Sequence, residues 1–502
     1  MSQLVILPIL IPLFSSMLIL FAKMLNHKTQ QTLSFLALFF LNVVNIMALF
    51  AVLKNHTLVY QMGNWIAPYG ITFVLDYLSV TMLLVTSILS LGSLWYGVKL
   101  KIDGDGVNFH VLFQLLIFGI NGAFLTGDVF NLFVFFEVLL LSSYALALHG
   151  NGKLRVRFGM HYMVINLVGS TLFLFAVGAL YGILGTLNIA DMALKVSQLT
   201  PDNQGVVASA GLLLLLVFGL KAAMFPLYFW LPGTYANTSA PVAAMFAIMT
   251  KIGIYSIIRV HGTIFGDLAG ELSYYYIPWI LGLGIVTLIL STVGIMSAKN
   301  LKTQVAYFVL SSAATLQISI GINSPIALSS TIFYLIQSTF VAAGFFLLSD
   351  TLTILRGEYK DYIKSSPIFK KRVYIGSIFF AYAIAITGMP PLSGFLAKSM
   401  ILYAGLESSH MSLIYSSILI TSFFMIISLT RAGSTIFYNV IEDKKHLEKN
   451  VTKSTIHPII YFLITSVLMV LFANYITAFT DKISTQIFDV KGYIQSVLGV
   501  SL

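Results

Sequence analysis

Apolar runs of roughly 20 residues recur along the whole chain, and they constrain the fold more than any other feature of the sequence. Each run can cross a hydrocarbon core about 30 Å thick as an α-helix. Only 9% of the 502 residues are charged and 58% are hydrophobic, whereas a soluble domain has about 25% charged residues. The sequence therefore predicts an all-α polytopic membrane protein. Because the chain has no cysteine, disulfides and cysteine-ligated metal centres are excluded.

We expect about fourteen transmembrane helices, which leave no room for a soluble domain. The first lacks the basic residues and the cleavage pattern of a signal peptide, so we interpret it as a retained helix. The expected spans lie near residues 2–22, 30–53, 73–98, 108–126, 128–149, 157–184, 206–231, 237–260, 274–297, 303–322, 326–350, 373–400, 412–440 and 455–480.

Basic residues are distributed unequally between alternate loops, and this asymmetry predicts the orientation of the chain. One set of loops holds 19 basic residues and the other set holds 5. The first set comprises Lys23, Lys28, Lys99, Lys101, Lys153, Arg155, Arg157, Lys299, Lys302, Arg356, Lys360, Lys364, Lys370, Lys371, Arg372, Lys444, Lys445, Lys449 and Lys453. The second set comprises Lys54, Lys195, Arg259, Lys482 and Lys491. The richer loops are expected in the cytoplasm, so an even number of spans puts both termini outside. The net charge of +10 then reflects contact with anionic lipid rather than with nucleic acid.

Three ionisable side chains lie near the middle of apolar spans, namely Glu137, Lys221 and Lys251. A charge near the bilayer centre costs roughly 2.5 to 3.5 kcal/mol on insertion scales, so each residue calls for an explanation. Burial disfavours the charged form of a group and pairing favours it, so groups held between the two effects can exchange protons. We interpret the three residues as a lateral proton relay. The alternative is an ion pair that only fixes helix packing.

Prolines interrupt two of the expected spans, within residues 221–232 and 388–398. Proline lacks a backbone donor and clashes with the preceding turn, so both helices are expected to be kinked or broken. Pro226 and Pro391 occupy similar places in the two halves of the chain, and paired interrupted helices are typical of a transport site. Carbonyl groups freed at such breaks can hold protons, water or cations. The alternative is that these prolines serve packing alone.

Other polar residues give weaker signals. Asp76 and Asp128 lie near the starts of spans, where a carboxylate stabilises the N-terminus of a helix. Arg259 lies near the end of a span, and we expect it at the membrane interface. His161 lies near a helix end, where a lone histidine is more often structural than part of a proton path.

Five stretches of the sequence resemble the antiporter-like subunits of the complex I superfamily. Within that superfamily they are most similar to the D subunits of the multi-subunit Mrp/Mnh/Pha cation/proton antiporters of bacteria. The stretches occur in the same order over the fourth to the twelfth expected span, at residues 121–137, 185–191, 221–232, 247–259 and 389–395. Several long motifs in the correct order make a chance resemblance improbable.

The resemblance implies proton-transfer roles for Glu137, Lys221, Lys251 and Lys398. It also implies a transporter subunit rather than an enzyme, with no cofactor and no metal ligand. Its partners would be the other subunits of an antiporter assembly, together with protons and Na⁺ or K⁺. Its location would be the bacterial cell membrane.

The resemblance further implies two inverted five-helix repeats that contain the broken helices. Residues 1–107 would form the first three helices, and residues 108–262 the first repeat. Residues 263–440 would form the second repeat, and residues 441–502 a last helix and a tail.

Three positions matter for how closely the chain follows this family. Respiratory members usually have histidine at the position of Tyr228, so this residue favours the antiporter branch. Relatives commonly have histidine at the position of Gln337 and lysine at the position of Ala342. Neither replacement can titrate, so a proton path through this helix would need bound water.

The predicted function is therefore coupling of inward proton movement to export of Na⁺ or K⁺. One alternative is a proton-pumping subunit of a respiratory NADH:quinone oxidoreductase or a membrane-bound hydrogenase, which would share the same scaffold. Another alternative is a non-transporting scaffold whose buried charges lock helices together. The sequence leaves open which cation is carried, with what stoichiometry, and through which of the subunits.

Overall fold

The computed structural model describes residues 2–22, 26–439, 441 and 453–500, and this part of the chain is almost entirely helical. The helices are α1 (Leu7–Ala22), α2 (His27–Asn55), α3 (Tyr77–Lys99), α4 (Phe109–Leu125), α5 (Val129–Leu148), α6 (Lys153–Leu184), α7 (Ile189–Ser197), α8 (Pro201–Lys221), α9 (Trp230–Asn237), α10 (Ala240–Phe246), α11 (Met249–Ser256), α12 (Gly262–Ile264), α13 (Ile277–Ser297), α14 (Leu301–Ile322), α15 (Pro325–Arg356), α16 (Arg372–Thr387), α17 (Ser393–Gly405), α18 (Met411–Phe437), α19 (Lys453–Leu471), α20 (Ala473–Phe488) and α21 (Val490–Leu498). Four basic residues of the predicted charge asymmetry, Lys23, Lys444, Lys445 and Lys449, lie outside the described residues.

Eleven helices of the described chain are long and apolar enough to cross a membrane. Three shorter apolar helices, α1, α4 and α16, coincide with the remaining expected spans. The prediction of an all-α polytopic membrane fold is therefore confirmed. These apolar runs form helices because the hydrocarbon core offers no hydrogen-bond partners to backbone N–H and C=O groups. In a helix, each of these groups is paired within its own segment.

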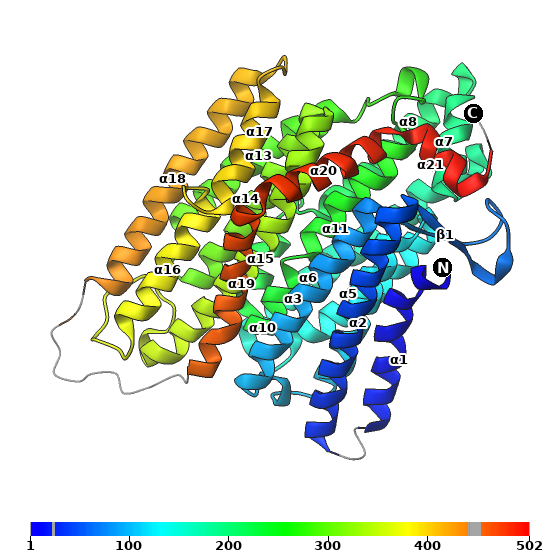
Figure 1. The fold of residues 1–502 in the computed structure, drawn as a ribbon. Helices are drawn as coiled ribbons and strands as arrows, with labels where there is room; N and C mark the ends of the chain where they lie inside the picture. Colours follow the sequence, from blue (N-terminus) through cyan, green and yellow to red (C-terminus); the bar gives the residue numbers. More distant parts are fainter. Residues whose placement is uncertain (1, 23–25, 440, 442–452, 501–502) are drawn as a thin grey trace.

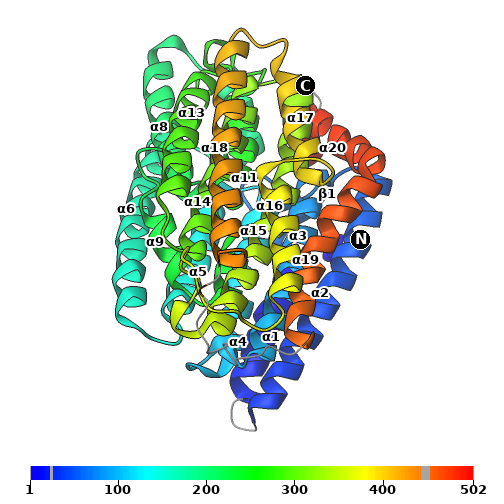
Figure 2. The same cartoon turned by 90° about the vertical axis from the view of Figure 1, so that its left-hand side faces the viewer.

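The centre of the bundle is formed by α15 and by the segment from α10 to α12. In the most apolar window of each span, 94% of the residues are buried around α15 and 100% in Ala240–Ile264, against 33% in α2 and in α18. Accordingly, α15 contacts α10, α14, α17 and α19. Figures 1 and 2 show α18 and the pair α1–α2 on opposite sides of the molecule, where they face outward.

Two expected spans are broken near their prolines, as predicted. In the first case helix α8 ends at Lys221, and the next helix, α9, begins at Trp230. In the second case α16 ends at Thr387 and α17 begins at Ser393. The span after the first break is also irregular, because α10 and α11 are followed by a π-helix, η4 (Ile257–His261), before α12. Such π-segments are rare and often occur at functional sites.

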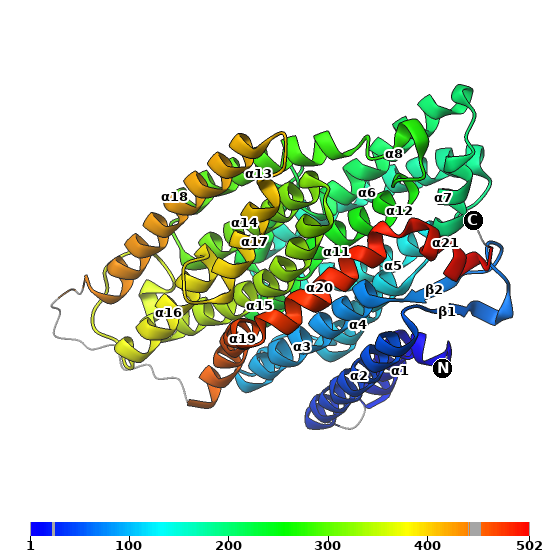
Figure 3. The ribbon, with the colours of Figure 1, turned by 45° about the horizontal axis from the view of Figure 1, so that its top comes forward.

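A β-hairpin separates α2 from α3. Strand β1 (Leu58–Gln61) pairs antiparallel with β2 (Thr72–Leu75), so that Leu58 lies opposite Leu75 and Gln61 opposite Thr72. All four residues of β2 are buried. Figure 3 shows this hairpin at the same end of the bundle as α21 and both ends of the chain.

The last expected span, 455–480, ends later than the corresponding helix in the structure. Helix α19 stops at Leu471, and the chain changes direction and continues as α20 (Figure 1). Buried residues of α20, including Thr480, Ile483 and Ile487, follow the helical repeat of one face, which packs on α15, α12 and α3. Lys482 on the other face is exposed. The hydropathy of the sequence does not separate α20 from the preceding membrane span, because the inward face of α20 is also apolar.

Candidate proton-transfer site

Glu137 lies near the middle of α5, as its ninth residue. Asp128 caps the start of this helix, as expected, and its carboxylate accepts a hydrogen bond from the backbone N–H of Asn131 at 2.7 Å. The Glu137 side chain is only half-buried, and its Oε1 accepts a hydrogen bond from the hydroxyl group of Ser170 on α6. Helix α6 therefore supplies the neutral group that holds this acid.

Lys221, the last residue of α8, is buried and contacts the same face of α6. Its Nζ donates a hydrogen bond to Oδ1 of Asn166 at 3.1 Å. Asn166 and Ser170 are four residues apart, so they are neighbours on one face of the helix. Glu137 and Lys221 thus each contact a neutral side chain, and the two neutral residues lie one turn apart on α6. A direct ion pair between them is not among the salt bridges of the described residues.

The break after Lys221 is held by side chains from other helices. The indole N–H of Trp230 donates to the backbone oxygen of Leu220 at 3.2 Å. The backbone N–H of Phe225 donates to the hydroxyl oxygen of Thr287 on α13 at 2.9 Å. Because these contacts satisfy backbone groups that a straight helix would pair internally, the helix can stop beside its buried amine.

Lys251 is completely buried in α11, and it contacts helix α14. Its Nζ donates to Oγ of Ser312 at 2.9 Å. One and a half turns further along α14, the amide of Gln317 lies 3.5 Å from the backbone oxygen of Ala222, at the first break. Helix α14 therefore contacts both Lys251 and the segment that follows Lys221.

Lys398 lies in α17, after the second break. Its Nζ donates to the backbone oxygen of Thr387 at 2.8 Å and to Oγ of Ser422 on α18 at 2.9 Å. Thr387 is the last residue of α16, so its carbonyl is one of those that the break releases from helical pairing. The expectation that a freed carbonyl can hold a cationic group is met here by the chain's own lysine.

The two residues that depart from the family pattern both lie buried in α15. Gln337 donates through Nε2 to the backbone oxygen of Ala385 at 2.9 Å, two residues before Thr387. It therefore contacts the same helix end as Lys398. Ala342 offers a methyl group only. The described chain thus places an amide and a methyl group at these positions, and neither can carry a proton as a titrating group.

Arg259 is buried, so its expected place at the interface is wrong. Only 4% of its side chain is exposed, and a guanidinium nitrogen lies 2.5 Å from Oδ2 of Asp76. The rings of Tyr255 and Tyr493 lie 5.7 Å and 5.4 Å from the guanidinium carbon. Asp76 also caps α3, as predicted. The prediction for Arg259 fails because α21, which carries Tyr493, folds back over this end of the bundle.

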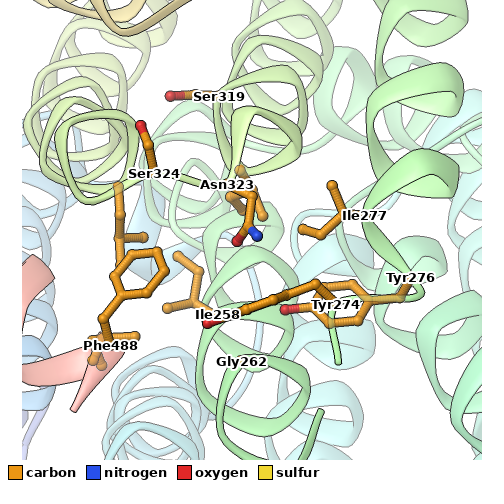
Figure 4. A pocket seen from close by; sticks show the side chains of 12 residues that line it. Ile258, Gly262, Tyr274, Tyr276, Ile277, Ser319, Asn323, Ser324 and Phe488 are labelled. Carbon is orange, nitrogen blue, oxygen red and sulfur yellow. The ribbon is translucent and has the colours of Figure 1, made fainter. Parts of the chain in front are cut away.

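Four cavities in the described chain lie away from the four predicted residues, among them a small one and a much larger one. A cavity of about 40 Å³ is surrounded by Tyr274, Ser319, Asn323 and Phe488, among other side chains, and all its described lining residues are uncharged (Figure 4). A larger cavity of about 470 Å³ is lined by Asp76 and by polar residues of α20 and α21. Neither cavity is lined by Glu137, Lys221, Lys251 or Lys398.

Comparison with known proteins identifies the family. Residues 126–425 match the family described as "NADH:quinone oxidoreductase/Mrp antiporter, TM". The chain is 33% identical over 501 residues to the D subunit of the Na(+)/H(+) antiporter of Bacillus subtilis (strain 168), and the match covers 99% of this chain and 100% of the relative. This chain belongs to the NADH:quinone oxidoreductase/Mrp antiporter family.

A second relative in this family is the D subunit of a probable K(+)/H(+) antiporter of Rhizobium meliloti (strain 1021), which is 39% identical over 422 residues. The match covers 79% of this chain and 78% of that relative. Na⁺ and K⁺ thus both occur in the names of similar D subunits. The chain is a multi-pass membrane subunit of the antiporter type.

Two solved structures have the same architecture as this chain. A chain of the Mrp complex from Dietzia sp. DQ12-45-1b matches with a TM-score of 0.88 and 25% identity over 99% of both chains. A chain of the membrane-bound sulfane sulfur reductase, an archaeal respiratory membrane complex, matches with a TM-score of 0.90 over 99% of this chain and 100% of that chain. Its identity is 22%, so this second likeness concerns the fold alone.

Sequence reasoning about this antiporter-family chain finds the charged residues but misses their neutral partners. Asn166 and Ser170 had a readable signal, because two polar side chains one turn apart stand out in the apolar α6. Ser312 and Ser422 had no such signal, since α14 and α18 contain several other serines and threonines.

Proposed function

We propose that this D-type antiporter subunit moves protons through Glu137, Lys221, Lys251 and Lys398, and that its assembly couples this movement to export of Na⁺ or K⁺. The names of the relatives from Bacillus subtilis and Rhizobium meliloti support antiport and leave both cations open. The likeness to a respiratory complex concerns the fold alone and lends the pumping alternative no specific support.

The observation that carries the proposal is the polar connection across α6. A hydroxyl group contacts Glu137, an amide contacts Lys221, and the two neutral groups are one turn apart. A hydroxyl group can donate and accept at once, so it can pass a proton without keeping a charge. Proton transfer requires partners at hydrogen-bond distance, and each of the two ionisable groups has one, while the Ser170 hydroxyl group also lies 3.1 Å from the backbone oxygen of Asn166.

The exposure of α5 supports work within an assembly. Glu137 is half-buried and shares an outward face with Phe130, Val134 and Leu141, whose exposed fractions are 45%, 41% and 65%. A carboxylate on a lipid-facing surface is costly. A partner subunit that covers this face would remove the cost, so we place the neighbouring subunit against α5.

The proposed orientation has the basic loops in the cytoplasm and both termini outside the bacterial cell membrane. Two basic loops come together in the structure, where Asn300 and Tyr362 form a β-bridge beside Lys299 and Lys364. Both described ends of the chain lie at the hairpin end of the bundle, which an even number of crossings requires (Figures 1 and 3). The charge asymmetry then assigns the end with the basic loops to the cytoplasmic side of the membrane.

The experiment compares Glu137→Ala with Glu407→Ala in everted vesicles that carry the whole assembly. Glu407 is an exposed glutamate in the connection between α17 and α18, so its removal controls for the loss of a carboxylate. Collapse of an imposed pH gradient after addition of NaCl or KCl measures exchange. We expect Glu137→Ala to assemble normally and to lose exchange, while Glu407→Ala exchanges like the wild type.

Each other outcome points to a different function. Normal exchange in Glu137→Ala would contradict the proposed path. Reduced assembly with unchanged activity per assembled complex would favour the scaffold role. A wild-type assembly that responds to neither salt would favour a respiratory partner. The salt that triggers the wild-type response identifies the cation.

A further inference from the structure

Three side chains with metal-ligating atoms meet outside the proposed proton path. They come from the start of α2, from the short helix η3 (Ile102–Gly104) and from the start of α4. Nε2 of His27 lies 2.9 Å from Oδ2 of Asp103, and Nε2 of His110 lies 3.1 Å from the same oxygen. All three candidate ligand atoms lie within 4.8 Å of one another.

These separations suit coordination of a single ion. Two ligands about 2.0 to 2.2 Å from one tetrahedral ion lie roughly 3.3 to 3.6 Å apart. The observed distances from the two imidazoles to Asp103 therefore need to widen by only a few tenths of an ångström. A small rotation of the His27 side chain provides part of this change, because His27 is half-exposed and has room to turn at the surface.

The hydrogen bonds around Asp103 are unevenly distributed. Its Oδ2 accepts from His27, His110 and Gln31, the last at 2.6 Å. Its Oδ1 is buried and, within the described chain, has no hydrogen-bond partner. A buried carboxylate oxygen without a partner is unfavourable. An ion that takes both oxygens of Asp103 would give this atom a partner.

Asp103 is also in the right charge state to serve as a ligand. The ordinary pKa of an aspartate side chain is about 3.9. The carboxylate is therefore ionised at neutral pH. In the present arrangement Nε2 of each imidazole donates to Asp103, so coordination through Nε2 requires the proton of each ring to move to Nδ1.

The donor set selects the kind of ion. Two imidazoles and one carboxylate suit first-row divalent metals such as Zn²⁺, whereas Mg²⁺ and Ca²⁺ prefer oxygen ligands throughout. His27 is 48% exposed on its side chain while Asp103 and His110 are buried, so an ion can enter past His27. Water would complete the coordination on that open side.

We propose that His27, Asp103 and His110 form a binding site for a divalent first-row transition-metal ion, with Zn²⁺ as the best fit. The ion would tie α2 to α4 at the start of both helices. The sequence conceals this site because His27 and Asp103 are 76 residues apart, a spacing that matches no local metal-binding motif.

The test uses the whole assembly, purified with an affinity tag that contains no histidine and stripped with a chelator. Calorimetry then measures Zn²⁺ binding to the wild type, to His27→Ala and to His410→Ala. His410 is an exposed histidine between α17 and α18, so it controls for unspecific loss of an imidazole. We expect one binding event per assembly that His27→Ala weakens by at least about tenfold and His410→Ala leaves unchanged.

A second measurement keeps the result independent of folding. Co²⁺ added to the stripped wild-type assembly should give visible absorption bands of a site with nitrogen and oxygen ligands. These bands should disappear in His27→Ala and in Asp103→Asn while both variants keep wild-type cation/proton exchange. Equal Zn²⁺ binding in the wild type and His27→Ala overturns the proposal. So does an effect of His410→Ala as large as that of His27→Ala.

Discussion

The two broken helices of this antiporter subunit hold their lysines in different ways. Lys221 precedes its break and contacts the side chain of Asn166, beyond which lie Ser170 and Glu137. Lys398 follows its break and contacts a freed backbone carbonyl and the hydroxyl group of Ser422. The first lysine thus has an acid two side chains away, whereas the described partners of the second are neutral.

This difference separates two roles that a broken helix can serve. A break alone can create a place for a buried amine, because it frees carbonyl oxygens that accept hydrogen bonds. An acid connected to that amine adds a second group whose charge responds to the first. We therefore expect the first half of the chain to contain the coupled step and the second half to relay its outcome.

Removing each lysine in turn tests this comparison most strongly. Lys221→Ala should lower exchange by about 100-fold or more, as loss of a positioned proton-transfer group does. Lys398→Ala should lower exchange less, by about tenfold, because water can replace a relay that has neutral partners. Initial rates of pH-gradient collapse at matched assembly measure both effects. Equal losses in the two variants would remove the distinction between the halves.

The arginines near the ends of the two halves sharpen the comparison through stability. Arg259 is buried against Asp76, whereas Arg431 on α18 is exposed. Asp76→Asn leaves the guanidinium buried without its partner and should destabilise the fold by about 3 to 5 kcal/mol. Arg431→Ala should change stability little. Thermal unfolding of the purified assembly measures both, and a stable Asp76→Asn variant would show that the pair contributes little.

The fold was more predictable than the site. The spans could be predicted, apart from the late end of the last one, because about 20 apolar residues with few charges leave the backbone no choice but a helix. Both breaks could be predicted from Pro226 and Pro391, since proline acts locally. The burial of Arg259 could not be predicted, because it depends on Tyr493, more than 200 residues later in the chain.

Ser170→Ala examines the connection between the acid and the amine of the first half. Loss of this hydroxyl group should reduce exchange by about tenfold, because Glu137 keeps its place but loses the neighbour that passes a proton. Thr171→Ala is the matched control, since Thr171 is exposed and its hydroxyl group donates to Leu167 of its own helix. Equal activity of the two variants would mean that protons bypass Ser170.

Gln337→His should have the smallest effect. Histidine at this position can still donate to Ala385 and adds a titrating group next to the end of α16. We expect exchange to rise by less than a factor of about ten, with a stronger dependence on pH between about 5 and 8. Rates measured across that interval would reveal the change. A pH profile identical to that of the wild type would mean that protons do not pass this side chain.

The π-helix between α11 and α12 has a further consequence for how the chain tolerates change. Each residue of an ordinary helix turns the chain by about 100°, so a segment with a wider turn resets the phase of everything after it. Lys251 lies before Ile257–His261, and α12 lies after it. The number of residues in this π-helix, more than their identity, sets how the face of α11 that carries Lys251 is oriented relative to α12. Lengthening or shortening it by one residue would rotate one face away from its neighbours while leaving every other side chain in the sequence unchanged.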